Sequence, residues 1–207
     1  MMFAEKIMIK APVPLEGVLA KGSCKSGVVL AHPHPLYGGE MNNPVVMILA
    51  KVFQKADWSS LRFNFRGVGA SQGAYDEGRG EVEDLLAASA FLKAQGVADI
   101  YLLGYSFGAW IIYQAAVAKR ISGMGIIMVA PPAAMVDFSP TIKLPDLCQV
   151  IVGENDEIAP PGQVKSLAQA WNPQALFNLI PDADHFFSGC QENMAAAIDH
   201  LVVKKKR

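Results

Sequence analysis

Ser106 is a potential nucleophile because a glycine lies two residues before it and another two residues after it. Residues 104–108 read Gly-Tyr-Ser-Phe-Gly and directly follow the apolar run 100–103. This G-x-S-x-G pattern predicts a buried strand that turns sharply into a helix, with the serine at the turn. Such a turn strains the serine backbone, and a side chain in place of either glycine would collide with the neighbouring strand and helix. The strain lifts the hydroxyl to where a base and a substrate can reach it.

Asp156 and His185 would complete the chemistry that a serine nucleophile needs. Asp156 follows the apolar segment 147–153, and His185 follows the segment 176–180 and a proline. A serine hydroxyl is a poor nucleophile at neutral pH, so a neutral imidazole must take its proton during attack. His185 would take that proton and pass it to the leaving group, while Asp156 would fix the tautomer of the ring. All three residues follow predicted strands, and the carboxyl ends of parallel strands meet at one edge of a sheet.

The negative charge that develops on an attacked carbonyl oxygen requires N–H donors as well. One predicted donor is the backbone N–H of Phe107, the residue after the serine. The second is expected from the loop 32–39, which reads His-Pro-His-Pro-Leu-Tyr-Gly-Gly. The two prolines have no N–H to donate, which leaves His34 as the first candidate and Leu36 and Tyr37 as the alternatives. The role asked of His34 is that of its main chain only.

Strand-like and helix-like segments alternate along the chain and would position these residues. This alternation predicts an α/β fold with a mostly parallel eight-stranded sheet and helices on both faces. The chain has no repeat and no linker, so residues 1–207 are expected to form one domain. The first two strands are predicted to be an edge hairpin. Predicted strands are 6–9, 15–20, 28–31, 60–65, 100–103, 125–129, 147–153 and 176–180, and predicted helices are 44–56, 81–95, 107–119, 161–170 and 192–203.

The connection 130–146, between the sixth and seventh predicted strands, has room for a loop but not for a helical lid. Ser106 is therefore expected to lie in a shallow, open cleft. Such a cleft suits small or flexible acyl groups and discriminates poorly among them.

Taken together, these segments resemble a small α/β-hydrolase without a cap, of the dienelactone-hydrolase-like type within the bacterial group of compact serine esterases. The resemblance is carried by residues 32–39, residues 61–73, and the residues Ser106, Asp156 and His185 in that chain order. It implies the α/β-hydrolase fold and a Ser-His-Asp hydrolase that acts on carboxylic esters or related acyl compounds without a cofactor. Dienelactone hydrolases proper use a cysteine nucleophile, so the serine argues against dienelactone as the substrate and for a general esterase-like activity.

Three other acidic residues lie near these positions in the sequence and are alternatives to Asp156 as the partner of the histidine. Glu157 would point elsewhere from the same turn, and Asp184 is adjacent to His185 and cannot easily face its ring across the site. Asp137 stays an alternative because some hydrolases place their acid after the sixth strand. Asp156 is preferred because its turn leads into a proline, which matches the usual position.

Several other residues in these loops are predicted to have structural roles. The glycine loop 66–73 lacks the spacing of a nucleotide-binding loop, and Arg66 is expected to brace it against Asp84. His32 is expected to brace its loop and not to act as a base. Trp110 is interpreted as a packing residue; because it lies one helical turn after the serine, a place on the floor of the cleft is the alternative.

Composition limits the partners and the compartment. The chain is 52% hydrophobic and 18% charged, which suits a sheet buried on both faces, and its net charge of −1 gives no reason to expect a nucleic acid or a membrane as partner. The basic run 204–207 is interpreted as a solvated helix end. Three cysteines without metal-ligand spacing and the lack of an apolar leader predict a cytoplasmic protein with no metal site. A lidless apolar cleft edge would suit pairing with a second copy, as a homodimer.

The chain is therefore predicted to be a serine hydrolase that cleaves carboxylic esters or related small acyl compounds through an acyl-enzyme on Ser106, in class EC 3.1. Thioesters and small acyl peptides are alternative substrates. A non-catalytic binding module that retains the fold is the alternative from another class of function. That alternative is disfavoured because every catalytic position is filled.

Overall fold

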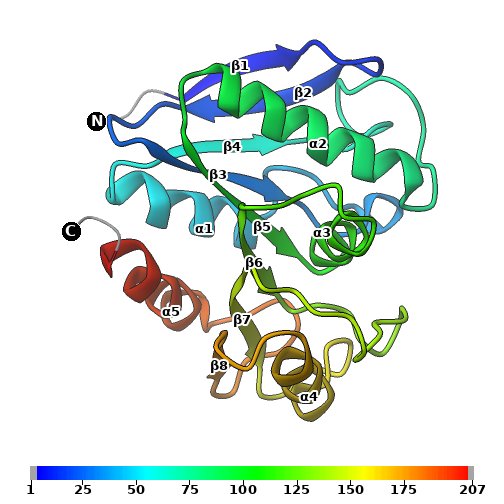
Figure 1. Cartoon of the computed structure of the whole chain (residues 1–207), viewed down its shortest axis with the longest axis vertical. Coiled ribbons are helices and arrows are strands. Elements are labelled where there is room, and N and C mark those ends of the chain that lie inside the picture. The colour runs from blue at the N-terminus through cyan, green and yellow to red at the C-terminus, as the bar shows by residue number, and fades with distance from the viewer. Residues whose placement is uncertain (1–3, 205–207) are drawn as a thin grey trace.

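The computed structural model describes residues 4–204, so most of the basic run 204–207 lies outside the described residues. Within them the chain forms a single eight-stranded sheet with the order β1-β2-β4-β3-β5-β6-β7-β8 (Figure 1). The strands are β1 (Ala4–Ile9), β2 (Leu15–Ala20), β3 (Ser26–Ala31), β4 (Ser59–Phe63), β5 (Asp99–Tyr105), β6 (Gly125–Val129), β7 (Leu147–Gly153) and β8 (Leu176–Ile180).

The first two strands form the predicted antiparallel hairpin, but only β1 lies at the edge of the sheet. The second edge of β2 pairs antiparallel with β4, with Gly17 opposite Phe63 and Ala20 opposite Ser60. The expectation of two edge strands was therefore wrong for β2. From β4 to β8 all neighbouring strands are parallel, as the alternation of strands and helices predicted.

Five helices cover both faces of the sheet within the described residues. They are α1 (Pro44–Lys55), α2 (Arg79–Ala94), α3 (Phe107–Val117), α4 (Pro161–Trp171) and α5 (Gln191–Lys204). Crossovers between parallel strands are right-handed, so the direction in which the chain moves along the sheet decides the face of each helix. The step from β3 to β4 runs opposite to the later steps, which puts α1 on one face with α5 and puts α2, α3 and α4 on the other (Figure 1).

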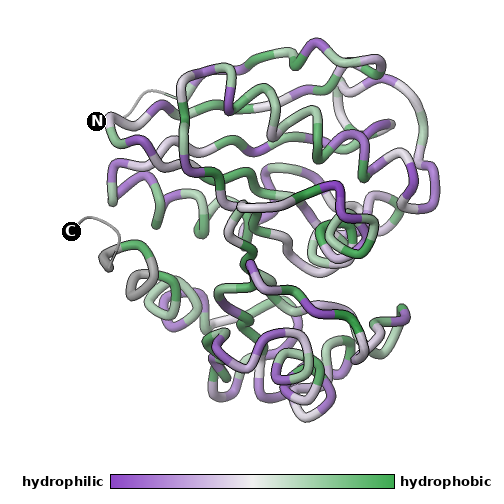
Figure 2. Tube along the Cα trace, viewed as in Figure 1, coloured by the Kyte–Doolittle hydropathy of each residue, from purple (hydrophilic) through white to green (hydrophobic). Residues whose placement is uncertain are grey.

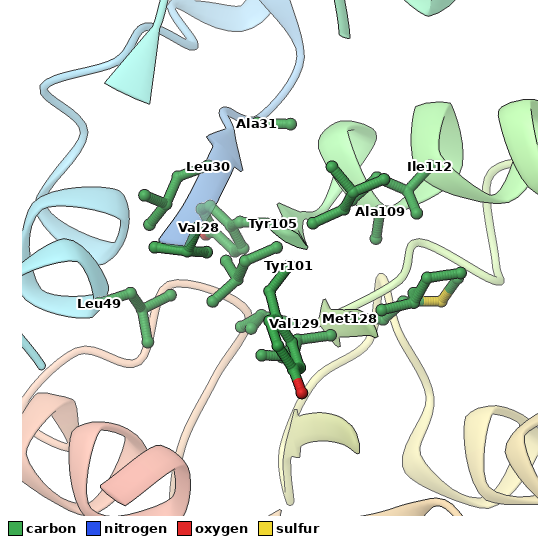
Figure 3. Packing of buried hydrophobic residues seen from close by; sticks show 14 of the residues in the cluster. Val28, Leu30, Ala31, Leu49, Tyr101, Tyr105, Ala109, Ile112, Met128 and Val129 are labelled. Atoms are coloured by element: carbon green, nitrogen blue, oxygen red, sulfur yellow. The ribbon is translucent and has the colours of Figure 1, made fainter. Parts of the chain in front are cut away.

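The hydrophobic core lies on both faces of the central strands. Every residue of β5 after Asp99 is buried, whereas most residues of the edge strands β1 and β8 are not. Figure 2 shows hydrophobic residues concentrated along the central strands. In Figure 3, Leu49 of α1 packs on one side of these strands, and Ala109 and Ile112 of α3 pack on the other. Strands buried on both faces read as continuous apolar runs, which is why the sequence located them well.

Strand β4 ends at Phe63, two residues earlier than predicted: the N–H of Asn64 still bonds to β2, but that of Phe65 turns away from the sheet. The N–H of Asn64 donates to the carbonyl of Glu16, and that of Phe65 donates to the ring of His32. These two bonds start the loop that supports the site.

The connection between β6 and β7 contains turns and extended chain but no helix, so no lid covers the sheet edge there. Along residues 4–204, no helix is both long enough and apolar enough to cross a membrane.

Candidate active site

Ser106 lies in the turn between β5 and α3 and has a backbone conformation that residues with side chains rarely adopt. Its φ is 52° and its ψ is −115°, a strain that costs about 1–3 kcal/mol. Its N–H donates to the carbonyl of Val129 at the end of β6, at 2.9 Å. A Cβ on Gly104 would lie 2.3 Å from the carbonyl carbon of Gly108, and one on Gly108 would lie 2.3 Å from the oxygen of Ala31. The predicted need for both glycines is confirmed.

His185 contacts both Ser106 and Asp156. Its Nε2 lies 3.0 Å from the Oγ of Ser106, and its Nδ1 lies 2.8 Å from Oδ2 and 3.0 Å from Oδ1 of Asp156. Because a carboxylate only accepts hydrogen bonds, Nδ1 carries the proton and Nε2 is the acceptor for the serine hydroxyl. No residue of the three is more than 8% exposed. The structure thus brings the three predicted residues together, with the ring in the tautomer that can accept a proton from the serine.

The Asp156 carboxylate is held by its own turn. Its Oδ1 accepts the backbone N–H groups of Ile158 and Ala159, at 2.9 and 2.6 Å, and Oδ2 is the oxygen nearer to Nδ1 of His185. Glu157 and the alternative acid Asp137 are both exposed. Within residues 4–204, Asp156 is the only acidic side chain that hydrogen-bonds the ring of His185.

The turn that carries His185 is fastened to the end of β7. The N–H of Asn155 donates to the carbonyl of Ala183 at 2.8 Å. The Asp184 carboxylate accepts the N–H groups of Ser188 and Phe186, both at 3.0 Å. These hydrogen bonds, that from Ser188 foremost, hold the pKa of Asp184 below its ordinary value. Asp184 therefore shapes the turn and does not face the ring.

Tyr105 is a supporting residue that the sequence analysis missed. Its hydroxyl donates to the carbonyl of His185 at 3.0 Å and so ties β5 to the turn after β8. Burial raises the pKa of Tyr105, with a further contribution from the charge of Asp156, so the hydroxyl keeps its proton and remains a donor. Its position next to Ser106 is the one sequence signal that could have drawn attention to it.

The loop after β3 folds into a short 3₁₀ helix, Pro35–Tyr37, whose own N–H groups are used within the loop. The N–H groups of Tyr37 and Gly39 donate to the carbonyl of His34, and that of Leu36 donates to the Nδ1 of His34 at 3.2 Å. Among the described residues, the N–H groups of His34 and Phe107 have no protein acceptor. Both residues line the same cavity as Ser106. This pattern favours His34 over Leu36 and Tyr37 as the second donor.

Several solved structures share this fold, although no protein-family model matches the chain. An α/β serine hydrolase homologue from Coxiella burnetii is 35% identical, with a TM-score of 0.85 over 97% of this chain and 98% of that one. The protein of unknown function ATU1826 from Agrobacterium tumefaciens is 31% identical, with a TM-score of 0.88 over 97% and 96%. XC6422 from Xanthomonas campestris, an α/β serine hydrolase without a lid, is 31% identical, with a TM-score of 0.85 over 99% and 97%.

The chain belongs to the α/β serine hydrolases that lack a lid. In this hydrolase a cavity of about 510 Å³ opens over Ser106. Its walls come from the loop after β3, from α3, from the connection between β6 and β7, and from the turn after β8. Trp110 lines it, which was the alternative to a packing role for this residue one turn after the serine. The open cleft expected from the short 130–146 connection is therefore present.

His32 braces two loops of the hydrolase, as predicted. It is fully buried; its Nδ1 donates to the carbonyl of Pro33 at 2.6 Å, and its Nε2 accepts the N–H of Phe65 at 3.0 Å. Burial lowers the pKa of His32 to about 4. The ring is therefore neutral near pH 7, and both of its nitrogens are occupied away from Ser106.

Arg66 and Asp84 form the predicted brace of the glycine loop. The guanidinium Nη2 lies 2.8 Å from Oδ1 of Asp84, and the backbone N–H of Arg66 donates to Oδ2 at 2.9 Å. The hydrogen bond to Asp84 raises the pKa of Arg66. Nearby, Glu16 accepts from Asn64 and from the N–H of Ala70, both at 2.9 Å. The polar groups of this loop are thus used to fasten it to its neighbours.

Histidine, cysteine and acidic side chains do not gather into a metal site in the part of the chain that the structure describes, where no group of three or more is placed to hold an ion.

Proposed function

We propose that this hydrolase cleaves carboxylic esters or related small acyl compounds, thioesters included, through an acyl-enzyme on Ser106. The observation that carries this function is the continuous line of hydrogen bonds from Ser106 through His185 to Asp156. In such a line the histidine takes the serine proton as the oxygen attacks, and the carboxylate stabilises the imidazolium that forms.

In the first half of the reaction, Oγ of Ser106 bonds to the substrate carbonyl carbon while its proton moves to Nε2 of His185. The carbonyl oxygen becomes an oxyanion, which the free N–H groups of His34 and Phe107 would stabilise. The bond to the leaving oxygen or sulfur then breaks, and His185 returns the proton to the leaving group. An acyl group is left on Ser106.

In the second half, water attacks the acyl carbon and gives a proton to Nε2 of His185. The bond to Oγ breaks, His185 reprotonates the serine oxygen, and the carboxylic acid leaves. No cofactor takes part in this sequence, and Asp156 stays ionised throughout.

Labelling with a fluorophosphonate probe, followed by intact-mass analysis, tests the activated serine. We expect one adduct on the wild-type protein and none on Ser106→Ala or His185→Ala. Ser166→Ala is the matched control, because Ser166 is an exposed serine on α4 whose hydroxyl donates to the Gly162 carbonyl. It should label like the wild type.

Turnover of p-nitrophenyl acetate by the same variants tests the reaction itself. Retained turnover in folded Ser106→Ala would overturn the assignment. A folded wild-type protein that neither labels nor turns over any ester would favour the non-catalytic binding module instead.

A further inference from the structure

Among the described residues that line the cleft over Ser106, there is no lysine, arginine, aspartate or glutamate. Its lining is made of backbone, aliphatic and aromatic groups, the amide of Asn43, the hydroxyls of Ser106 and two tyrosines, and the rings of two histidines. A charged substrate group that enters such a cleft loses water and finds no opposite charge, which is strongly unfavourable. An uncharged chain avoids this desolvation penalty.

Three exposed side chains extend this lining to the surface; we call them the apolar rim. They are Tyr37, Met135 and Phe186, which are 77%, 60% and 61% exposed and which all line the cleft. Among the side chains whose exposure the structure describes, eight large hydrophobic ones are exposed, so three at one cavity is a concentration. The rim comes from three separate loops, and covering it with an apolar group would remove hydrocarbon from water.

We propose that the substrates of this site are esters or thioesters whose acyl group is an uncharged apolar chain, and that the apolar rim holds the distal part of that chain. This substrate class rests on the proposed function. The cavity of about 510 Å³ falls within the range of volumes found for sites that bind small molecules. The chain would run from the Ser106 carbonyl position along the neutral lining to the rim.

A matched pair of substrates tests, on the wild-type protein, whether the site prefers an uncharged acyl chain to a charged one. p-Nitrophenyl hexanoate and mono-p-nitrophenyl adipate have the same acyl length and leaving group, but the adipate ends in a carboxylate. We expect kcat/KM for the hexanoate to exceed that for the adipate by about tenfold or more, because the carboxylate must stay hydrated or be buried without a partner.

A series from p-nitrophenyl acetate to octanoate tests the rim. We expect kcat/KM to rise by about twofold to fourfold for each added methylene that reaches the lining. Met135→Ser and Phe186→Ser should each lower the octanoate-to-acetate ratio of kcat/KM. Met8→Ser is the matched control, because Met8 is 46% exposed on β1, away from the cleft.

The outcomes separate this substrate class from the proposed function. Equal turnover of hexanoate and adipate, both lost in Ser106→Ala, would overturn the uncharged class and leave the hydrolase assignment standing. An unchanged octanoate-to-acetate ratio in both folded rim variants would overturn the role of the rim. Absence of any ester turnover together with absence of a fluorophosphonate adduct would overturn both.

The imidazole of His34 contacts both its own loop and the residue that follows Ser106. Its Nδ1 accepts the N–H of Leu36, the bond that closes the 3₁₀ turn behind the free His34 N–H. Its ring packs on the ring of Phe107, with centroids 4.7 Å apart, and on Tyr75, with centroids 5.2 Å apart. The side chains of the two residues with free N–H groups therefore contact each other directly.

The geometry points to the His34 side chain as a positioning residue that sets the spacing of the two N–H donors. Only proline would delete a backbone donor, and it would also change the backbone of the loop, whereas other substitutions disturb the placement of the donor through the side chain alone. Oxyanion stabilisation acts in the transition state and not on the bound substrate, so the effect should fall on kcat and spare KM.

Three substitutions at His34 separate its contributions, since all keep the backbone N–H. His34→Ala removes both the acceptor and the ring, and we expect kcat for p-nitrophenyl acetate to fall by about tenfold at nearly constant KM, less than full loss of a donor would cause. His34→Asn keeps an acceptor at the Nδ1 position, and His34→Phe keeps the ring; each should restore part of kcat. Wild-type kcat in His34→Ala, or a change confined to KM, would overturn the positioning role.

Discussion

Replacing Asp156 with asparagine should invert the tautomer of His185 while leaving the turn intact. Oδ1 of Asp156 accepts the N–H groups of Ile158 and Ala159, so the amide oxygen of an asparagine must occupy that position. Its NH2 group then takes the place of Oδ2, which lies 2.8 Å from Nδ1 of His185. A donor at that point requires Nδ1 to be an acceptor, which puts the ring proton on Nε2, facing Ser106.

The expected loss of kcat can be estimated from the burial of Asp156 and His185. To regain the productive tautomer, the Asp156→Asn protein must give up the Asn–His hydrogen bond at a site where Asp156 is 2% and His185 7% exposed. Such a bond in an apolar setting is worth about 4–6 kcal/mol, and each 1.4 kcal/mol or so is tenfold in rate, so kcat should fall about 10³- to 10⁴-fold.

Turnover of p-nitrophenyl acetate near pH 7 is the assay, with a thermal melt to show that Asp156→Asn is folded. Glu157→Gln and Asp137→Asn are the controls, because both carboxylates are exposed and neither contacts His185. Both should keep wild-type turnover. If folded Asp156→Asn keeps more than about a tenth of the activity, the tautomer reasoning is wrong; if Asp137→Asn loses activity instead, the acid has been misassigned.

Three further changes test the supports of the site. Tyr105→Phe removes the hydroxyl that donates to the His185 carbonyl, and urea unfolding should show a loss of about 1–3 kcal/mol because a buried acceptor is left unpaired. Burial lowers the pKa of His32 to about 4, so as pH falls this imidazole is protonated in the unfolded chain before it is protonated in the folded one. The free energy of unfolding should therefore drop between about pH 6.5 and 4, by up to about 1.4 kcal/mol per pH unit. His32→Gln should remove the part of this drop that is due to His32. Gly108→Ala places a Cβ 2.3 Å from a carbonyl oxygen and should cost about 1–3 kcal/mol and reduce ester turnover.

Each of these changes has its own contradicting result. An unchanged unfolding free energy in Tyr105→Phe would mean that its hydrogen bond adds nothing. The same loss of stability with falling pH in His32→Gln and wild type would assign that loss to other groups. Gly162→Ala is the matched control for Gly108→Ala, because no atom lies within 4 Å of the added Cβ on the helix α4; it should be neutral or gain about 0.5–1 kcal/mol. Equal behaviour of the two alanine variants would refute the packing explanation.

Local patterns were sufficient to predict the strands, the helices and the serine turn. The buried central strands read as apolar runs because both faces are covered, and the glycines around Ser106 mark a turn that only small residues permit. The end of β4 was misplaced because the N–H of Phe65 leaves the sheet for the ring of His32, which lies far away in the sequence. The outer position assigned to β2 was wrong for the same reason, since its second partner strand lies about forty residues later.

The order of Ser106, Asp156 and His185 along the chain, each after a strand, was enough to nominate them, because parallel strands end at one edge of the sheet. Only the tertiary structure decided that Asp156 and not Asp137 faces the histidine, and that the loop after β3 leaves the N–H of His34 free. The tertiary structure alone shows that Tyr105 bonds to the turn that carries His185. It also shows that Tyr37, Met135 and Phe186 lie at one cavity. These features depend on contacts between segments distant in the chain, and a local pattern carries no record of which segments meet.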